Sequence, residues 1–201
     1  MKKLLILLII SILFSGCVTQ ISTPPISPTK ETGHLMIAFK DSIQRLRGLG
    51  KATQLDLEIS TISVVKDDSE INILDNTKKF DLLQFSDKKA LLVEKEFETG
   101  NYDGIKIYIE NASVRIYNLE MYIFNKTYLM WIPDKEINLN YSFIIEKNKK
   151  LILILDFDVP YSITKEPDPE TGIYYYTLRP VIEISEETLE FDQTCGDCEV
   201  V

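Results

Sequence analysis

Apolar and polar residues alternate along most of the chain that follows Gly33. Ile105, Ile107 and Ile109 are separated by Lys106 and Tyr108, and the apolar positions between 137 and 145 share one parity. A period of two places alternate side chains on opposite faces of an extended strand. The pattern therefore predicts strands with one buried face and one wet face.

Similar patterns recur at short, regular intervals. The other segments that we expect to form strands are 34–39, 55–64, 70–74, 79–84, 90–95, 102–110, 113–117, 119–124, 127–132, 149–158 and 173–184. Within 55–64 the apolar parity flips at Ser60-Thr61, which predicts a β-bulge or a strand break. Asn125-Lys126 predicts a tight hairpin turn, because asparagine tolerates positive φ.

Many short strands with almost no helix predict an all-β fold. We expect an antiparallel β-sandwich, Greek-key or transthyretin/immunoglobulin-like, or a barrel. The one helical indication is 41–50, where Asp41 or Ser42 could cap a turn that carries Ile43, Leu46 and Leu49. At most one short helix is therefore expected.

The first residues predict where the protein resides. Two lysines precede an apolar run from Leu4 to Phe14, which as a helix would rise about 16 Å against a hydrocarbon core of about 30 Å. The run is thus typical of a secretory signal and too short for a span. Ser15, Gly16 and Cys17 resemble a prokaryotic lipobox, although Phe14 replaces its usual aliphatic residue.

The lipobox resemblance implies that Cys17 is lipidated and becomes the mature N-terminus, since a thiolate is the nucleophile that accepts the lipid. An ordinary signal peptide with a chance cysteine is the alternative. The expected organisation is a signal peptide at 1–16, a lipidated cysteine with a Pro/Ser/Thr linker at 17–32, a β-sandwich at 33–190 and an acidic CxxC tail at 191–201. Localisation would be extracytoplasmic, with the membrane as partner through the lipid.

Net charge excludes one class of partner. The formal charge is −9 for the whole chain and −11 once residues 1–16 and their two lysines are removed. Such a surface repels phosphate backbones and no basic stripe occurs, so we expect no nucleic acid. No phosphate loop or dinucleotide fingerprint is present, and we expect no cofactor.

Two clusters carry candidate chemistry. Cys195 and Cys198 form a CxxC motif. A zinc site needs four ligands, and no second cysteine pair or nearby histidine is present to complete one. We therefore expect a local disulfide, with a metal or redox role as the alternative. Asp156 and Asp158 are expected to share one strand face, and such a pair could serve acid–base work or help bind calcium. The competing interpretation is that the strand face becomes wet there, just before Pro160.

Other residues suggest surface roles. Asn111, Asn125 and Asn140 head glycosylation sequons, of which Asn125 would be the most accessible. Trp131 and the run Tyr174 to Tyr176 supply aromatic surface; Tyr175 takes the opposite face from its neighbours, and the exposed face could stack on a sugar ring or a partner. No catalytic set of nucleophile and base is found, and His34 is the single histidine.

Several stretches together resemble a known family. They are GHLMIAFKDS, LDLEISTISVV, KKFDLLQF, LLVEKEFETGNYDGIKIYIENASV, LILILDFDVPYSI and YYYTLRPVIEI. They are similar to the prokaryotic extracytoplasmic domain of unknown function 4382, over about residues 33–184. The resemblance implies a secreted or lipid-anchored β-domain without established activity. The family's Asp-Ala-Pro turn is replaced here by Asp41-Ser42-Ile43.

These observations favour a non-catalytic module that binds or displays an envelope protein or polysaccharide. The alternatives are a structural role in envelope assembly through edge-strand pairing, and a carboxylate-dependent hydrolase or calcium-binding domain that uses Asp156 and Asp158.

Overall fold

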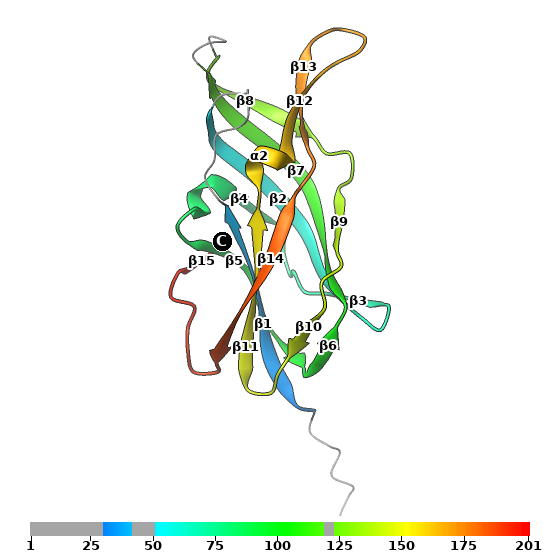
Figure 1. Cartoon of the computed structure of the whole chain (residues 1–201), viewed down its shortest axis with the longest axis vertical. Helices are drawn as coiled ribbons and strands as arrows, with labels where there is room; N and C mark the ends of the chain where they lie inside the picture. The colour runs from blue at the N-terminus through cyan, green and yellow to red at the C-terminus, as the bar shows by residue number, and fades with distance from the viewer. Residues whose placement is uncertain (1–29, 42–50, 119–122) are drawn as a thin grey trace, which may run out of the picture.

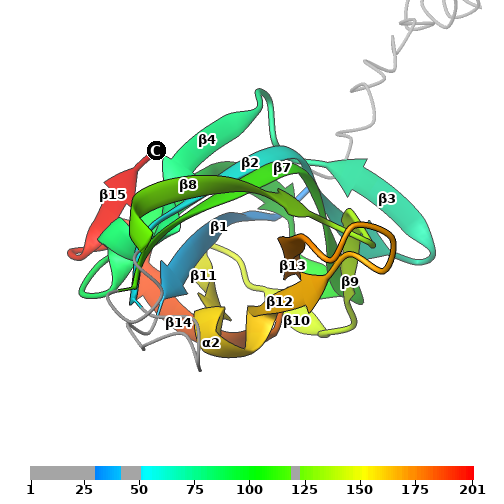
Figure 2. The ribbon, with the colours of Figure 1, turned by 90° about the horizontal axis from the view of Figure 1, so that it is seen from above.

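Two β-sheets pack face to face and enclose the core. The computed structural model describes residues 30–41, 51–118 and 123–201. In the view from above, β2, β7 and β8 arch over β1 and β11 (Figure 2). The expected all-β, sandwich-like fold is confirmed.

The first sheet has the strand order β14-β11-β1-β5-β15. Its strands are β1 (Thr32–Asp41), β5 (Lys89–Glu98), β11 (Lys149–Phe157), β14 (Ile182–Glu190) and β15 (Cys198–Val200).

The second sheet follows the order β12-β13-β8-β7-β2-β3, with β4 paired to β2 and β9 paired to β7. Its strands are β2 (Lys51–Lys66), β3 (Ser69–Asn72), β4 (Lys78–Asp81), β7 (Gly104–Asn118), β8 (Ile123–Trp131), β9 (Glu136–Leu139), β12 (Ile163–Pro167) and β13 (Tyr174–Leu178).

Short elements complete the described chain. They are the pair β6 (Gly100–Tyr102) and β10 (Phe143–Ile145), the 3-10 helix η1 (Leu82–Phe85) and the α-helix α2 (Val159–Ser162). None of the helices in the described residues is long and apolar enough to cross a membrane. The helical segment expected at 41–50 lies outside the described residues, apart from Asp41, which ends β1.

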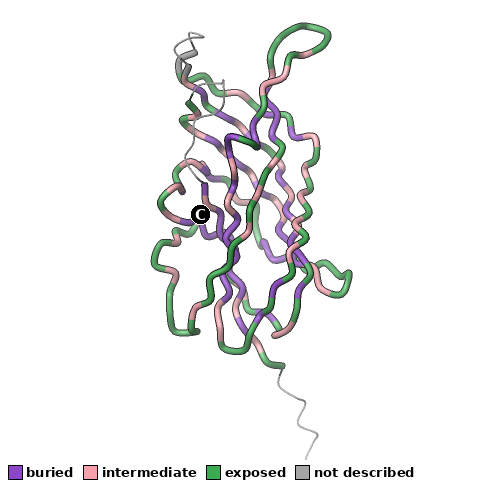
Figure 3. The backbone as a smooth tube through the Cα atoms, viewed as in Figure 1, coloured by how far each residue is buried: buried purple, intermediate pink, exposed green. Residues whose placement is uncertain are grey.

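The core forms from the alternating positions that the sequence marks. Leu35, Ile37 and Phe39 of β1 face Leu55 and Leu57 of β2, and all are fully buried. Burying large side chains contributes about 1.5–3 kcal/mol each and is the main force that holds the two layers together. Figure 3 shows the buried residues on the strands between the layers, while the β12–β13 hairpin and the segment after β14 are mostly exposed.

The parity flip near Ser60 is a bulge within one continuous strand. Ile59 pairs with Ile109, whereas Thr61 pairs with Tyr108, so β2 has one extra residue there. The bulge moves the inward parity from Leu57 and Ile59 to Ile62 and Val64, which are all fully buried. Both halves of β2 therefore supply the same core.

The turn predicted at Asn125-Lys126 is wrong. Asn125 does have a positive φ of 46°, which asparagine tolerates, but it lies inside β8. Ile116 pairs with Lys126 and Asn118 pairs with Ile123, so the extra residue makes a bulge in β8. The predicted strand 119–124 lies outside the described residues up to 122, and its last two residues belong to β8. β7 runs unbroken through the predicted strand 113–117.

Three strand pairs are parallel, so the sheets are mixed instead of purely antiparallel. They are β1 with β11, β8 with β13, and β5 with β15. Period-two patterning marks faces and carries no information about strand direction.

Two segments expected as single strands are divided. Residues 173–184 form β13 and β14 in different sheets, because Pro180 lacks the amide that a continuous ladder requires. Residues 137–145 likewise divide between β9 and β10. The residues set apart as a C-terminal tail return to the body, where β15 pairs with β5 at the edge of the first sheet.

Candidate functional site

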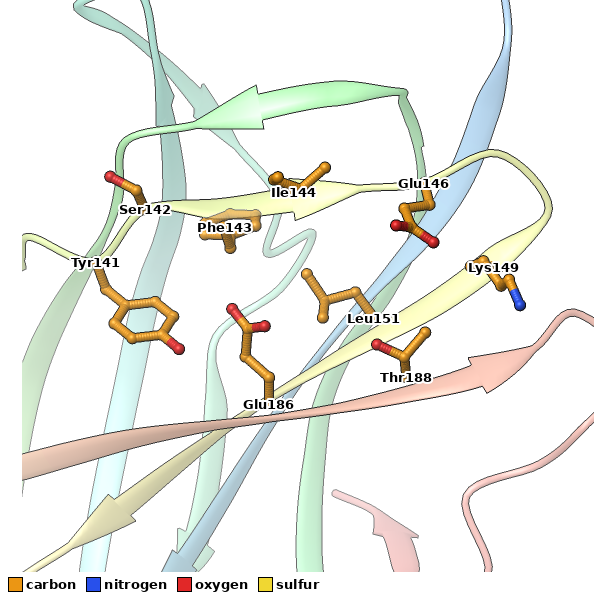
Figure 4. Close-up of a pocket in the computed structure, with 9 residues that line it drawn as sticks. All are labelled: Tyr141, Ser142, Phe143, Ile144, Glu146, Lys149, Leu151, Glu186 and Thr188. Carbon is orange, nitrogen blue, oxygen red and sulfur yellow. The ribbon is translucent and has the colours of Figure 1, made fainter.

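The β10–β11 hairpin opens into a pocket. The cavity measures about 410 Å³ and lies between β10 on one side and β11 and β14 on the other. We call it the hairpin pocket (Figure 4). The residues that line it are Tyr141, Ser142, Phe143, Ile144, Glu146, Lys149, Leu151, Glu186 and Thr188.

Strand register explains how polar groups come to face inward here. Leu151 pairs with Thr188, and Leu153 pairs with Glu186. On β14, Ile182 and Ile184 pack against the main core, and the next two positions of the same parity are Glu186 and Thr188. The face that is apolar at the start of β14 therefore becomes the polar wall of the pocket.

The floor of the pocket is apolar and rigid. Phe143 and Leu151 are both buried, and the ring of Phe143 stacks on Tyr102, with centroids 5.3 Å apart. Tyr102 is itself fully buried and donates a hydrogen bond to the carbonyl of Glu98 at 2.9 Å. The floor is thus held by the core and does not depend on a ligand.

Glu186 and Tyr141 form the polar side of the pocket. Figure 4 shows the tyrosine hydroxyl and the carboxylate pointing toward each other. Burial raises the pKa of Tyr141, and the charge and hydrogen bond of Glu186 raise it further, so the phenol stays protonated. The pair offers one carboxylate acceptor and one hydroxyl group. Glu146 adds a second carboxylate to the lining, and Ser142 and Thr188 add two more hydroxyls.

The one cation in the pocket wall already has a partner. Lys149 donates to Glu190 across the β11–β14 pair. Its charge is therefore neutralised locally. The pocket suits a ligand that has hydroxyl groups and an apolar face more than it suits a free anion.

Asp156 and Asp158 do not share a strand face, because β11 ends at Phe157 and Asp158 lies beyond it. Ile152 and Ile154 belong to the outer cluster of the first sheet, and Asp156 continues that outer face. Asp158 caps α2, where its side chain accepts from the Tyr161 amide at 3.3 Å. Asp156 stands beside Lys40 in the β1–β11 register. Neither residue lines the hairpin pocket.

Cys195 and Cys198 form a disulfide in the structure, with their Cα atoms 5.4 Å apart. Both sulfur-bearing side chains pack against the outer apolar cluster of Met36, Leu91 and Ile152. With Asp197 they are the one group of three or more potential metal ligands that lie close together in the described residues. Their sulfur atoms are bonded to each other in this state.

The remaining predicted sites lie apart from the pocket. Asn111 and Asn125 are exposed on β7 and β8, and Asn111 donates to Glu58 at 3.1 Å. Asn140 is exposed between β9 and β10. Cys17 lies outside the described residues, so its lipidation stays a prediction.

Sequence reasoning missed the roles of three polar residues, two of which are buried. The sequence predicts that the glutamates of 183–190 form a charged outer edge or tail; Glu186 is exposed accordingly, but its parity with Ile182 and Ile184 turns it toward the pocket. Sequence reasoning gives no role to Lys89 and treats Asp41 only as a possible helix cap, and both residues are buried. Asp41 keeps the parity of Leu35, Ile37 and Phe39, which is the available signal that it points into the core.

The fold and the pocket define a β-sandwich module with a ligand-sized opening between its sheets. Residues 32–180 match the family model described as a domain of unknown function (DUF4382), and the chain belongs to that family. No curated protein and no solved structure matches the chain. The family named from the sequence is thereby confirmed.

Proposed function

We propose that this protein is a lipid-anchored, extracytoplasmic module that binds a hydroxyl-bearing component of the cell envelope without chemically changing it. The observation that carries the proposal is the hairpin pocket, which combines a preformed apolar floor with two carboxylates and three hydroxyl groups. Preformed sites of this mixed character are typical of ligand binding. The signal-like N-terminus and the Pro-rich linker supply the anchor and the spacer.

The anchor is tested by replacing its cysteine. Cys17→Ser should abolish incorporation of labelled fatty acid into the protein in the native host, because a hydroxyl does not replace the thiolate nucleophile. The variant should also leave the membrane fraction, since two acyl chains supply the stable attachment. Cys195→Ser is the matched control and should keep the label. Persistent label on the Cys17 variant would contradict the proposal.

The pocket is tested by changing one functional group at a time. Glu186→Gln and Tyr141→Phe should each weaken binding of solubilised envelope polysaccharide by about tenfold, since hydrogen bonds to a charged group contribute about 1.5–3 kcal/mol. Equilibrium dialysis with the purified protein gives the affinity. Glu183→Gln is the matched control, because Glu183 lies on the same strand with the opposite parity. Equal affinity of all four proteins would remove the pocket from the proposal.

The charge of β14 favours binding over assembly. This strand forms one edge of the first sheet and carries Glu183, Glu186, Glu187 and Glu190. Charged edge strands resist pairing with a second sheet because like charges would be brought into contact. Edge-strand assembly, the alternative from the sequence, is therefore the weaker proposal for this edge.

A further inference from the structure

A second feature of the molecule is an exposed aromatic surface on the side of the second sheet that faces away from the core. In the parallel pairing of β8 with β13, Met130 lies beside Tyr176 and Trp131 lies beside Thr177. Met130 and Tyr176 are buried, so Trp131 and Tyr175 point outward. Together with Leu129, which is exposed next to them on β8, they form what we call the aromatic platform.

The platform exposes more apolar surface than a solvated sheet face requires. Leu129 is 84% exposed and Trp131 is 52% exposed, on adjacent outward positions of one strand. Isolated apolar residues on a surface are ordinary, but neighbouring ones with a large ring indicate a contact surface. The rings of Trp131 and Tyr175 meet edge to face, with centroids 6.1 Å apart and planes at 79°.

Hydrogen bonds hold the Tyr175 ring of the platform in place, and the Trp131 ring packs against it. The Tyr175 hydroxyl donates to Glu166 Oε2 at 3.2 Å, and Arg179 donates to Glu166 Oε1 at 2.6 Å. Because these bonds restrict the tyrosine before any ligand arrives, less conformational entropy is lost on binding. The platform is therefore organised in the free protein.

A row of short polar groups continues from the platform across the neighbouring strands. Leu129 pairs with Ser113, and Ser113 pairs with Asp56, while Asn111 pairs with Glu58. A shallow hollow of about 60 Å³ lies among Leu129, Asn111, Ser113, Asp56 and Glu58. Amide, hydroxyl and carboxylate groups thus stand next to the exposed rings, all on one face.

Charges on this face nearly balance. The carboxylates of Asp56, Glu58, Asp81 and Glu166 stand with the cations of Lys79, Arg115 and Arg179 on the same or adjoining strands, a local excess of one negative charge, whereas the whole chain carries −9. A nearly neutral area on an acidic protein attracts ions of either sign only weakly over a distance. The partner that complements it is uncharged.

From these observations we infer that the aromatic platform and its polar row bind an uncharged saccharide chain. A pyranose ring presents an apolar face of C–H groups, which fits the rings of Trp131 and Tyr175, and equatorial hydroxyls, which fit the polar row. The inference rests on the proposed location outside the cytoplasm and is independent of the hairpin pocket. Figure 1 shows β8, β12 and β13 at the end of the body opposite the start of β1, where the linker joins, so this end faces away from an anchored membrane.

The chain carries its own reporter for the test, because Trp131 is its single tryptophan. Purified full-length protein is titrated with β-1,4-glucan, mannan and N-acetylglucosamine oligomers, and with polygalacturonate as the anionic comparison. We expect a saturable change in tryptophan fluorescence with a neutral oligomer and none with polygalacturonate. Calorimetry on the same oligomer should give at least a tenfold loss of affinity for Tyr175→Ala and for Trp131→Ala.

Matched variants separate this inference from the other possibilities. Tyr174→Ala removes an exposed ring of the opposite parity and should leave affinity unchanged, as should Glu183→Gln, which changes a residue of β14 in the other sheet. Loss of binding in Glu186→Gln but not in Tyr175→Ala would overturn the platform and leave the proposed function standing. Absence of saturable binding by any neutral oligomer would also overturn it. A third outcome would also overturn the inference. If sedimentation showed that the native protein is a dimer and that Trp131→Ala is a monomer, the platform would be a self-association surface.

Discussion

Asp41→Asn should stabilise this protein above neutral pH. The native chain should lose stability between about pH 4 and pH 7, and the variant should lose much less over the same range. The side chain of Asp41 keeps the inward parity of β1, is fully buried, and has neither carboxyl oxygen hydrogen-bonded to any residue that the structure describes. Burial, together with the charges of Asp156, Asp158 and Asp81, raises the pKa of this carboxyl from 3.8 to about 7. An ionised Asp41 is therefore costly in the folded state.

The direction of the pH effect follows from proton binding. Between pH 3.8 and about 7 the folded chain holds a proton on Asp41 that the unfolded chain has released. The contribution of this proton to the free energy of unfolding is complete below the pKa of Asp41 in the unfolded chain. It is lost as the pH rises toward the pKa of Asp41 in the folded chain, by about 1.4 kcal/mol per pH unit. Over the whole interval the loss is on the order of 4 kcal/mol, a large part of the stability of an ordinary domain.

Urea unfolding at a series of pH values measures this effect. The urea concentration at the unfolding midpoint of the native chain should fall steadily from pH 4 to pH 8. The midpoint of Asp41→Asn should fall far less and should be higher than that of the native chain at pH 8. Asp87→Asn makes the same change in net charge at an exposed position and should follow the native curve. Parallel curves for the native chain and Asp41→Asn would show that Asp41 is ionised in the folded state without penalty.

Lys89→Met should have the second large effect, because it releases the C-terminal segment from the sheet. The Lys89 side chain is 6% exposed, and its ammonium donates to both carboxylate oxygens of Glu187 at 2.8 Å and to Asp197 at 3.0 Å. Burial lowers the pKa of Lys89, but the hydrogen bonds to Glu187 and Asp197 outweigh this and raise it. The ammonium thus joins β5, β14 and the disulfide loop.

The expected cost is about 2 kcal/mol, less than the roughly 3–5 kcal/mol of a fully buried pair, because both carboxylates are about half exposed and regain water. Methionine keeps the apolar stem over the outer cluster of the first sheet. Free energies of unfolding give the cost. Amide exchange at Cys198–Val200 should accelerate, since β15 contributes only three residues to the sheet edge.

The adjacent lysine provides the control. Lys88 also holds the C-terminal segment, through Glu199, but both side chains of that pair are substantially exposed. Lys88→Met should cost about 0.5 kcal/mol or less, as exposed ion pairs do. If the two variants lost the same stability, burial would not be the source of the strength of the Lys89 contacts.

The local pattern of residues determines much of this fold. The alternation in β7, the parity flip in β2 and the tolerance of Asn125 for positive φ all depend on neighbouring residues, and each corresponds to a strand face or a bulge. Backbone geometry allows few local solutions for such sequences, so the β-sandwich could be predicted from the chain alone. The family was indicated separately, by the resemblance of several sequence stretches to it.

Strand direction, partner choice and the pocket were decided only by the tertiary structure. Parallel pairing of β1 with β11, the return of β15 to β5 and the division of residues 173–184 between two sheets join positions far apart in the sequence. Glu186 faces Tyr141 only because β14 extends past the core into the open β10–β11 hairpin. A similarly long stretch of sequence separates Asp41 from Asp156 and Asp158, which raise its pKa. Period-two patterning assigns a residue to one face of a strand. Which group lies opposite that residue depends on which strands pack together, and this is decided by the packing of the entire chain.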